Sequence, residues 1–166
     1  MGMELRGFLG AVAGLRKWRL ASAVVCPLAG ELAFVPLTAA LWRDLRARLD
    51  PGEAERLDVD RRNAWPPPSF EEAARRWAAE ASAQMPLAYV DLFEFGNMGH
   101  ERATLWRDGR IVIDAGRLSD AVAYLRDQVH LDVGSAPIDL EKYRGETAAE
   151  KWAASVGPPA EKRGLE

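Results

Sequence analysis

The stretch PLAYVDLFEFGNMGHERATLWRDGRIVID, residues 86–114, decides the fold. Its first part, Leu87–Phe95, is rich in Tyr, Val and Phe and largely apolar on both faces, which is typical of a strand in the middle of a sheet. The loop Gly96–Gly99 follows it. Asp108-Gly109 is a two-residue pair that favours a tight hairpin turn between strands at 103–107 and 110–114. The stretch therefore predicts three consecutive strands that pair antiparallel.

Helical patterns lie on both sides of this stretch. Apolar residues from Phe70 to Ala81 recur three and four positions apart, and Ser69 with Glu72 forms a capping-box pattern in front of them. Thr38 is suited to cap a second helix at 39–49, and a third pattern runs over 118–129. The order of elements favours an α+β fold, a mostly antiparallel sheet with about three helices packed on one face.

The remaining segments set the expected domain boundaries. Residues 1–18 fit no template and are interpreted as an N-terminal extension, and 153–166 as a flexible C-terminal tail rich in Pro, Gly and charge. Between them, 19–152 is expected to form a single α+β domain. It begins with buried strands near 19–26 and 31–35 and contains a polar loop at 52–68.

Composition excludes several classes of protein. The 166 residues carry 22 Lys+Arg and 25 Asp+Glu, a net charge of −3, which disfavours a general nucleic-acid-binding surface. A single cysteine, Cys26, cannot form an internal disulfide, so a disulfide-stapled secreted scaffold is excluded. The longest uncharged runs have 11 residues, short of the roughly 20 that span a bilayer, so no membrane span is expected.

Motifs for metal, cofactor or nucleophilic chemistry are missing from the sequence. His100 and His130 with Cys26 cannot assemble a common zinc site without carboxylates, and no nucleotide-binding or nucleophile motif occurs. We therefore expect no metal, no cofactor and no catalytic residue.

Asp91 is the carboxylate that attracts most interest. Strand alternation places it on the face of Tyr89 and Phe93, opposite to Glu94. A buried carboxylate there needs a partner, and buried acids often mark functional sites. One hypothesis is therefore a small hydrolase or ligand-binding enzyme with a cleft in which Asp91 and His100 come within hydrogen-bond reach. The alternative is a solvated position at the rim.

Residues 86–101 also carry a family resemblance. The segment resembles a small bacterial family whose strand ends in a Phe-Gly-Gly-x-Gly-x-Gln-type turn, with Asn97 here in place of the second Gly and Glu101 in place of Gln. The Trp-x-Asp-Gly motif at 106–109, the following strand and helix, and the Val-Pro-Leu-Thr motif at 35–38 match the order of that family. The family is similar to immunity-like proteins that neutralise a toxin.

The resemblance implies a non-enzymatic, cytoplasmic role in protein binding. Our leading hypothesis is a protein-binding module, an immunity-type inhibitor of a bacterial toxin, whose exposed acidic groups complement a basic partner and accelerate association. The partner surface is predicted at the end of the sheet and its loop, formed by Asp91, Glu94, Asn97, Met98, His100 and Glu101.

Overall fold

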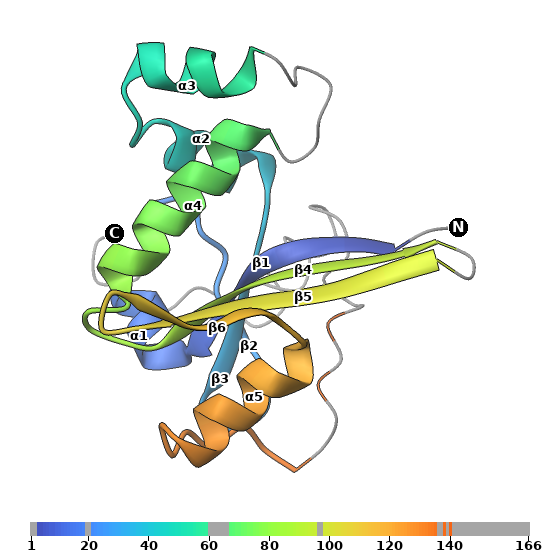
Figure 1. The fold of residues 1–166 in the computed structure, drawn as a ribbon. Coiled ribbons are helices and arrows are strands. Elements are labelled where there is room, and N and C mark those ends of the chain that lie inside the picture. Colours follow the sequence, from blue (N-terminus) through green and yellow to red (C-terminus); the bar gives the residue numbers. More distant parts are fainter. Residues whose placement is uncertain are drawn as a thin grey trace.

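A six-stranded antiparallel sheet runs through the chain in a computed structural model that describes residues 3–18, 21–59, 67–95, 98–135, 138 and 140 (Figure 1). The strand order is β2-β3-β1-β4-β5-β6. The strands are β1 (Met3–Ala11), β2 (Cys26–Pro27), β3 (Leu32–Pro36), β4 (Leu87–Phe95), β5 (Met98–Arg107) and β6 (Arg110–Gly116). The three strands expected from residues 86–114 are confirmed, with β4 inside the sheet.

Five helices within the described residues cover the sheet on both faces, as Figure 1 shows. They are α1 (Val12–Trp18), α2 (Ala39–Arg46), α3 (Pro51–Asp58), α4 (Pro68–Ala81) and α5 (Leu118–Asp127). Helices α1 to α4 pack into one core, and α5 packs alone against the opposite face. The predicted α+β fold is confirmed, although the helices are more numerous than the three expected and α5 lies apart from the others.

Strand alternation divides the core into two layers. On β1, Phe8 faces α4, whereas Leu5 and Leu9 belong to the core under α5. Both layers are apolar near the middle of the sheet because helices cover both faces there. We name the two sides of the sheet the α4 face and the α5 face.

The N-terminal segment is not an extension of the domain, contrary to the prediction from sequence. Residues of β1 pair with β3 on one side and β4 on the other, so Met3–Ala11 lies near the centre of the sheet. The segment resisted prediction because glycine is rare in strands. Gly7 is required here, since a Cβ at this position would collide with the carbonyl oxygen of Val35 and the ring of Phe34.

Two other local expectations also need correction. Within the described residues, the strand expected at 19–26 is reduced to Cys26–Pro27. The polar stretch expected to form a loop at 52–68 instead begins with helix α3, and residues 60–66 lie outside the described residues. Asp50 and Pro51 therefore start a helix instead of only ending the previous one, as proline is well tolerated in a first helical turn. The predicted C-terminal tail at 153–166 lies outside the described residues.

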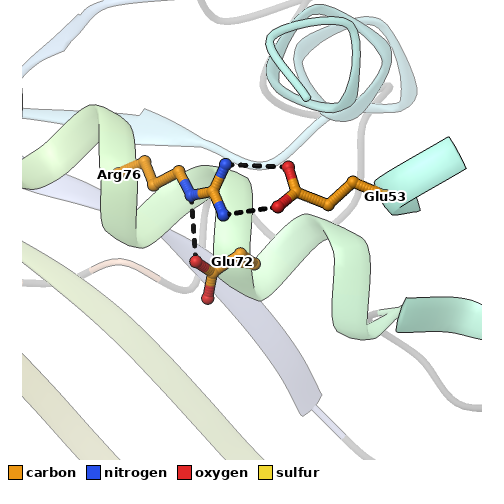
Figure 2. A network of polar contacts seen from close by, with 3 residues as sticks. All are labelled: Glu53, Glu72 and Arg76. Carbon is orange, nitrogen blue, oxygen red and sulfur yellow. Dashed lines mark hydrogen bonds and ion pairs between the residues drawn. The ribbon is translucent and has the colours of Figure 1, made fainter. Parts of the chain in front are cut away.

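The start of α4 is held by side chains from α3 instead of by the predicted capping box. The backbone N–H and the hydroxyl of Ser69 both donate to the carboxylate of Asp58, at 2.8 and 2.7 Å. Glu72 instead accepts from Arg76 at 2.9 Å, and the same guanidinium donates two 2.8 Å hydrogen bonds to Glu53 (Figure 2). These contacts fix α3 along the outer side of α4.

The hairpin at Asp108-Gly109 is confirmed. Both residues have positive φ, 54° and 78°, as a type I′ turn requires. The N–H groups of Asp108 and Gly109 donate to the carbonyl and hydroxyl oxygens of Ser82, each at 2.9 Å, so the turn is anchored to the end of α4. None of the described helices is long and apolar enough to cross a membrane.

Candidate functional site

Asp91 lies on the α4 face of β4, between two arginines on the neighbouring strands. In the sheet register it is opposite Arg6 of β1 and opposite Arg102 of β5. Arg6 Nε approaches Asp91 Oδ1 at 3.3 Å, and His100 Nε2 approaches Asp91 Oδ2 at 3.2 Å. His100 reaches Asp91 because it is opposite Phe93, which makes it a diagonal neighbour on the same face of the sheet.

The exposed fraction of the side chain increases from Arg6 through Asp91 to His100. Arg6 is 8% exposed, Asp91 22% and His100 45%, so the group leads from the interior to solvent. The contact between Arg6 Nε and Asp91 Oδ1 is an ion pair without the alignment of a hydrogen bond. Asp91 Oδ1 therefore keeps its capacity to accept a hydrogen bond.

Tyr89 lies one step further along the same face of β4. Its ring packs against Phe8 and Phe70, with ring centroids 5.5 and 6.0 Å apart. Its hydroxyl is buried and has no hydrogen-bond partner among the described residues. Burial raises the pKa of the hydroxyl well above its ordinary value, and the nearby Asp91 carboxylate raises it further. The hydroxyl therefore stays protonated and is able to donate a hydrogen bond.

A cavity of about 170 Å³ opens next to these groups, between α4 and the strands β4 to β6. Helix α4 forms one wall and the sheet forms the other. The lining residues are Glu71, Ala74, Arg75, Tyr89, Asp91, Arg102, Thr104, Trp106, Asp114 and Ala115. The lining thus combines apolar residues with charged residues of both signs.

Comparison with known proteins adds nothing to this geometry. No family model, curated protein or solved structure matches the chain. The resemblance to immunity-like proteins therefore stays a prediction, and the site has to be interpreted from its own contacts.

The residues predicted for a partner surface do not all converge. Asp91 and His100 are in contact, as the cleft hypothesis required. Glu101 serves the other side of the sheet, where its Oε1 accepts a 2.6 Å hydrogen bond from the N–H of Leu118 and so caps the start of α5. Asn97 and the side chains of Glu94 and Met98 lie outside the described parts of the structure.

Several site residues were missed from the sequence. Arg102 and Thr104 share the two-residue alternation of His100, so extending β5 back from the hairpin could have placed them on the same face. Arg6 carried no such signal, because the strand containing it was not predicted. Glu71 and Arg75 lie on the polar side of a predicted helix, and only the packing of α4 brings them to the cavity.

Metal ligation finds no support among the side chains that the structure describes. No three of their His, Cys, Asp or Glu side chains come together as a set of ligands. Cys26 is fully buried in the core of the α5 face, away from the cavity. The polar side chains that line the cavity can form hydrogen bonds and ion pairs.

Proposed function

We propose that this chain binds a small polar molecule in the cavity between α4 and strands β4 to β6. The observation that carries the proposal concerns two residues that line the cavity, Tyr89 and Asp91. Each holds a buried side-chain atom, Tyr89 Oη and Asp91 Oδ1, that forms no hydrogen bond with any described residue. Leaving a buried hydroxyl such as that of Tyr89 unsatisfied costs about 1–3 kcal/mol. A ligand whose binding turns this hydroxyl toward the cavity and accepts its hydrogen bond offsets that cost, and the carboxylate of Asp91 can accept from the same ligand.

The volume of the cavity limits the size of the ligand. Drug-sized ligands occupy pockets of roughly 300–1,000 Å³. At about 170 Å³ the cavity is smaller and suits a molecule of a few heavy atoms beyond its polar groups. Trp106 and Ala74 supply apolar surface for its carbon skeleton.

His100 extends the proposed site toward solvent. Its imidazole is 45% exposed, and its Nε2 lies 3.2 Å from the second oxygen of Asp91. Hydrolysis of a bound molecule stays a prediction.

A screen for ligands tests the proposal. The melting temperature of the full chain is measured with a panel of small polar compounds, in parallel with Tyr89→Phe and with Tyr124→Phe. Tyr124 is the matched control, since its hydroxyl accepts from Arg107 and lies outside the cavity. We expect a compound that stabilises the wild type and the control and binds Tyr89→Phe about tenfold or more weakly, the effect of one lost hydrogen bond.

Two results would overturn the proposal. One is a panel in which no compound stabilises the wild type, which assigns the cavity to water alone. The other is a set of binders whose affinities are the same for Tyr89→Phe and for Tyr124→Phe, which places the binding site elsewhere.

Inhibitory protein binding is the second candidate. The edge strand β6 favours it, because Ile111 and Val112 are both 43% exposed on a sheet edge that no described strand covers. Charge reversal tests the predicted partner surface best at Glu94, since a reversal at Glu101 also removes the cap of α5. An unchanged affinity for a purified partner would exclude Glu94 from the surface.

A further inference from the structure

Several exposed charged side chains line the cavity. Arg48, Arg76 and Arg126 each pair with a carboxylate at 2.6–2.9 Å. By contrast, four exposed charges that line the cavity form no ion pair with any described residue. They are two cations, Arg75 and Arg102, and two anions, Glu71 and Asp114.

The lining of the cavity therefore carries charges of both signs. Its cations are Arg75 and Arg102, and its carboxylates are those of Glu71, Asp91 and Asp114. A ligand with separated positive and negative groups gains from both, because complementary charges at an interface select for partners that match them.

The cavity also provides matching hydrogen-bond groups. Tyr89 donates, Thr104 can donate, and guanidinium groups bind carboxylates in a forked geometry. The carboxylate of Asp91 can accept from a donor such as an ammonium group, which also matches its charge. Trp106 lies in the lining of the same cavity, on the far side of Thr104 from Arg102 along β5.

We infer that the ligand is a zwitterion of the size of a free amino acid. Its carboxylate is held by Arg102 and Arg75 together with the hydroxyl of Tyr89, and its ammonium group donates to Asp91. This inference rests on the proposed function, since it names the class of molecule that the same cavity takes.

Isothermal titration calorimetry on the full chain tests the class of ligand. The probes are the twenty common L-amino acids, each small one compared with its single-charge analogues, such as L-alanine with propionate, isopropylamine and L-alaninamide. We expect at least one amino acid to bind about tenfold or more tightly than each of its analogues, because either analogue leaves one set of charges without a partner.

Substitutions at the mouth of the cavity separate the two charges of the ligand. Arg102→Gln is expected to weaken the amino acid about tenfold while isopropylamine binding stays unchanged, because the loss concerns the carboxylate alone. Arg110→Gln is the matched control, an exposed arginine of β6 that does not line the cavity. Equal effects of the two substitutions would contradict the assignment of Arg102.

The results distinguish this inference from the proposed function. An analogue with one charge that binds as tightly as the amino acid overturns the inference and leaves a small-molecule site in place. The same holds if no amino acid binds but another polar compound binds in a manner that depends on Tyr89. If no compound of either panel binds, the proposed function fails together with the inference.

Discussion

The two faces of the sheet differ sharply although they are built from the same strands. On the α5 face, the core includes Leu5 of β1, Leu92 of β4 and Leu105 of β5. On the α4 face, the neighbouring positions Arg6 and Asp91 are charged. Identical backbone pairing therefore supports an apolar core on one side and a polar site on the other.

The packing of α4 explains this difference. The aromatic contacts of Phe8 with Trp77 and Tyr89, at 4.7 and 5.5 Å between ring centroids, mark the last apolar layer on the α4 face. Beyond it, Arg6 and Asp91 are opposite each other in the register of β1 and β4. The comparison shows that the polar site begins where the aromatic layer under α4 ends.

The largest expected effect belongs to the α5 face. Leu105 is fully buried, so Leu105→Ala should lower the free energy of unfolding by about 2–5 kcal/mol through lost burial and a residual cavity. Thr104→Val, the adjacent position on the other face, serves as the control and should change it by less than about 1.5 kcal/mol. Denaturant unfolding measures both, and a larger loss for Thr104→Val would reverse our ranking of the two faces.

Removal of the charge on Asp91 should have the next largest effect. Asp91→Asn removes the carboxylate charge that lies 3.3 Å from the buried guanidinium of Arg6, and we expect the free energy of unfolding to fall by about 1–3 kcal/mol. Asp114→Asn is the control, because that carboxylate is exposed and forms no ion pair with the described residues. If denaturant unfolding gives equal values for the two variants, the Arg6 contact adds nothing to stability.

Tyr89 is where the apolar layer and the polar site meet, and its hydroxyl should cost stability in the free protein. Tyr89→Phe removes a buried hydroxyl without a described partner and should raise the free energy of unfolding by about 1 kcal/mol. Tyr124→Phe, which loses a hydrogen bond from Arg107, should lower it slightly. A stability loss for Tyr89→Phe would indicate that its hydroxyl is already satisfied and would weaken the proposed function.

The stability that Tyr89→Phe gains over the wild type should increase at alkaline pH. Burial raises the pKa of Tyr89 in the folded state, so its hydroxyl ionises more readily in the unfolded chain. The resulting contribution to the free energy of unfolding is fully present below pH about 10, where an unfolded tyrosine ionises, and is lost as the pH rises further. The difference in stability between Tyr89→Phe and the wild type should therefore increase between pH 9 and 11, as roughly expected from proton linkage. A constant difference in stability over that interval would mean that the Tyr89 hydroxyl has the same pKa in the folded and the unfolded states.

The smallest effect is expected on the outer side of the helical layer. Hydrogen bonds from Arg76 hold the pKa of Glu53 below its ordinary value. The stabilisation of the fold by this carboxylate is therefore present at neutral pH and is lost as the pH falls through the folded-state pKa. Glu53→Gln should lower the melting temperature slightly at neutral pH and not in acid. Glu55→Gln, an exposed neighbour without an ion pair to any described residue, should show no such pH dependence.

Prediction from sequence succeeded where neighbours along the chain decide the structure. Asp108 and Gly109 adopt positive φ within a short turn, and Thr38 caps α2 by accepting from the N–H of Leu41 at 3.1 Å. It failed for α3 and for the start of α4, where Asp58 binds Ser69 from another helix. A side chain that finds its partner in a different element leaves no local pattern.

The amino-acid sequence by itself determined the α+β class, the strands of residues 86–114 and the face of β4 that carries Asp91, because alternation and turn chemistry act over a few residues. Only the tertiary structure decided that β1 enters the centre of the sheet and brings Arg6 to Asp91, and that α4 closes a cavity over Tyr89. The contact between Arg6 and Asp91 joins residues more than 80 positions apart in the sequence, and both features depend on how complete elements pack.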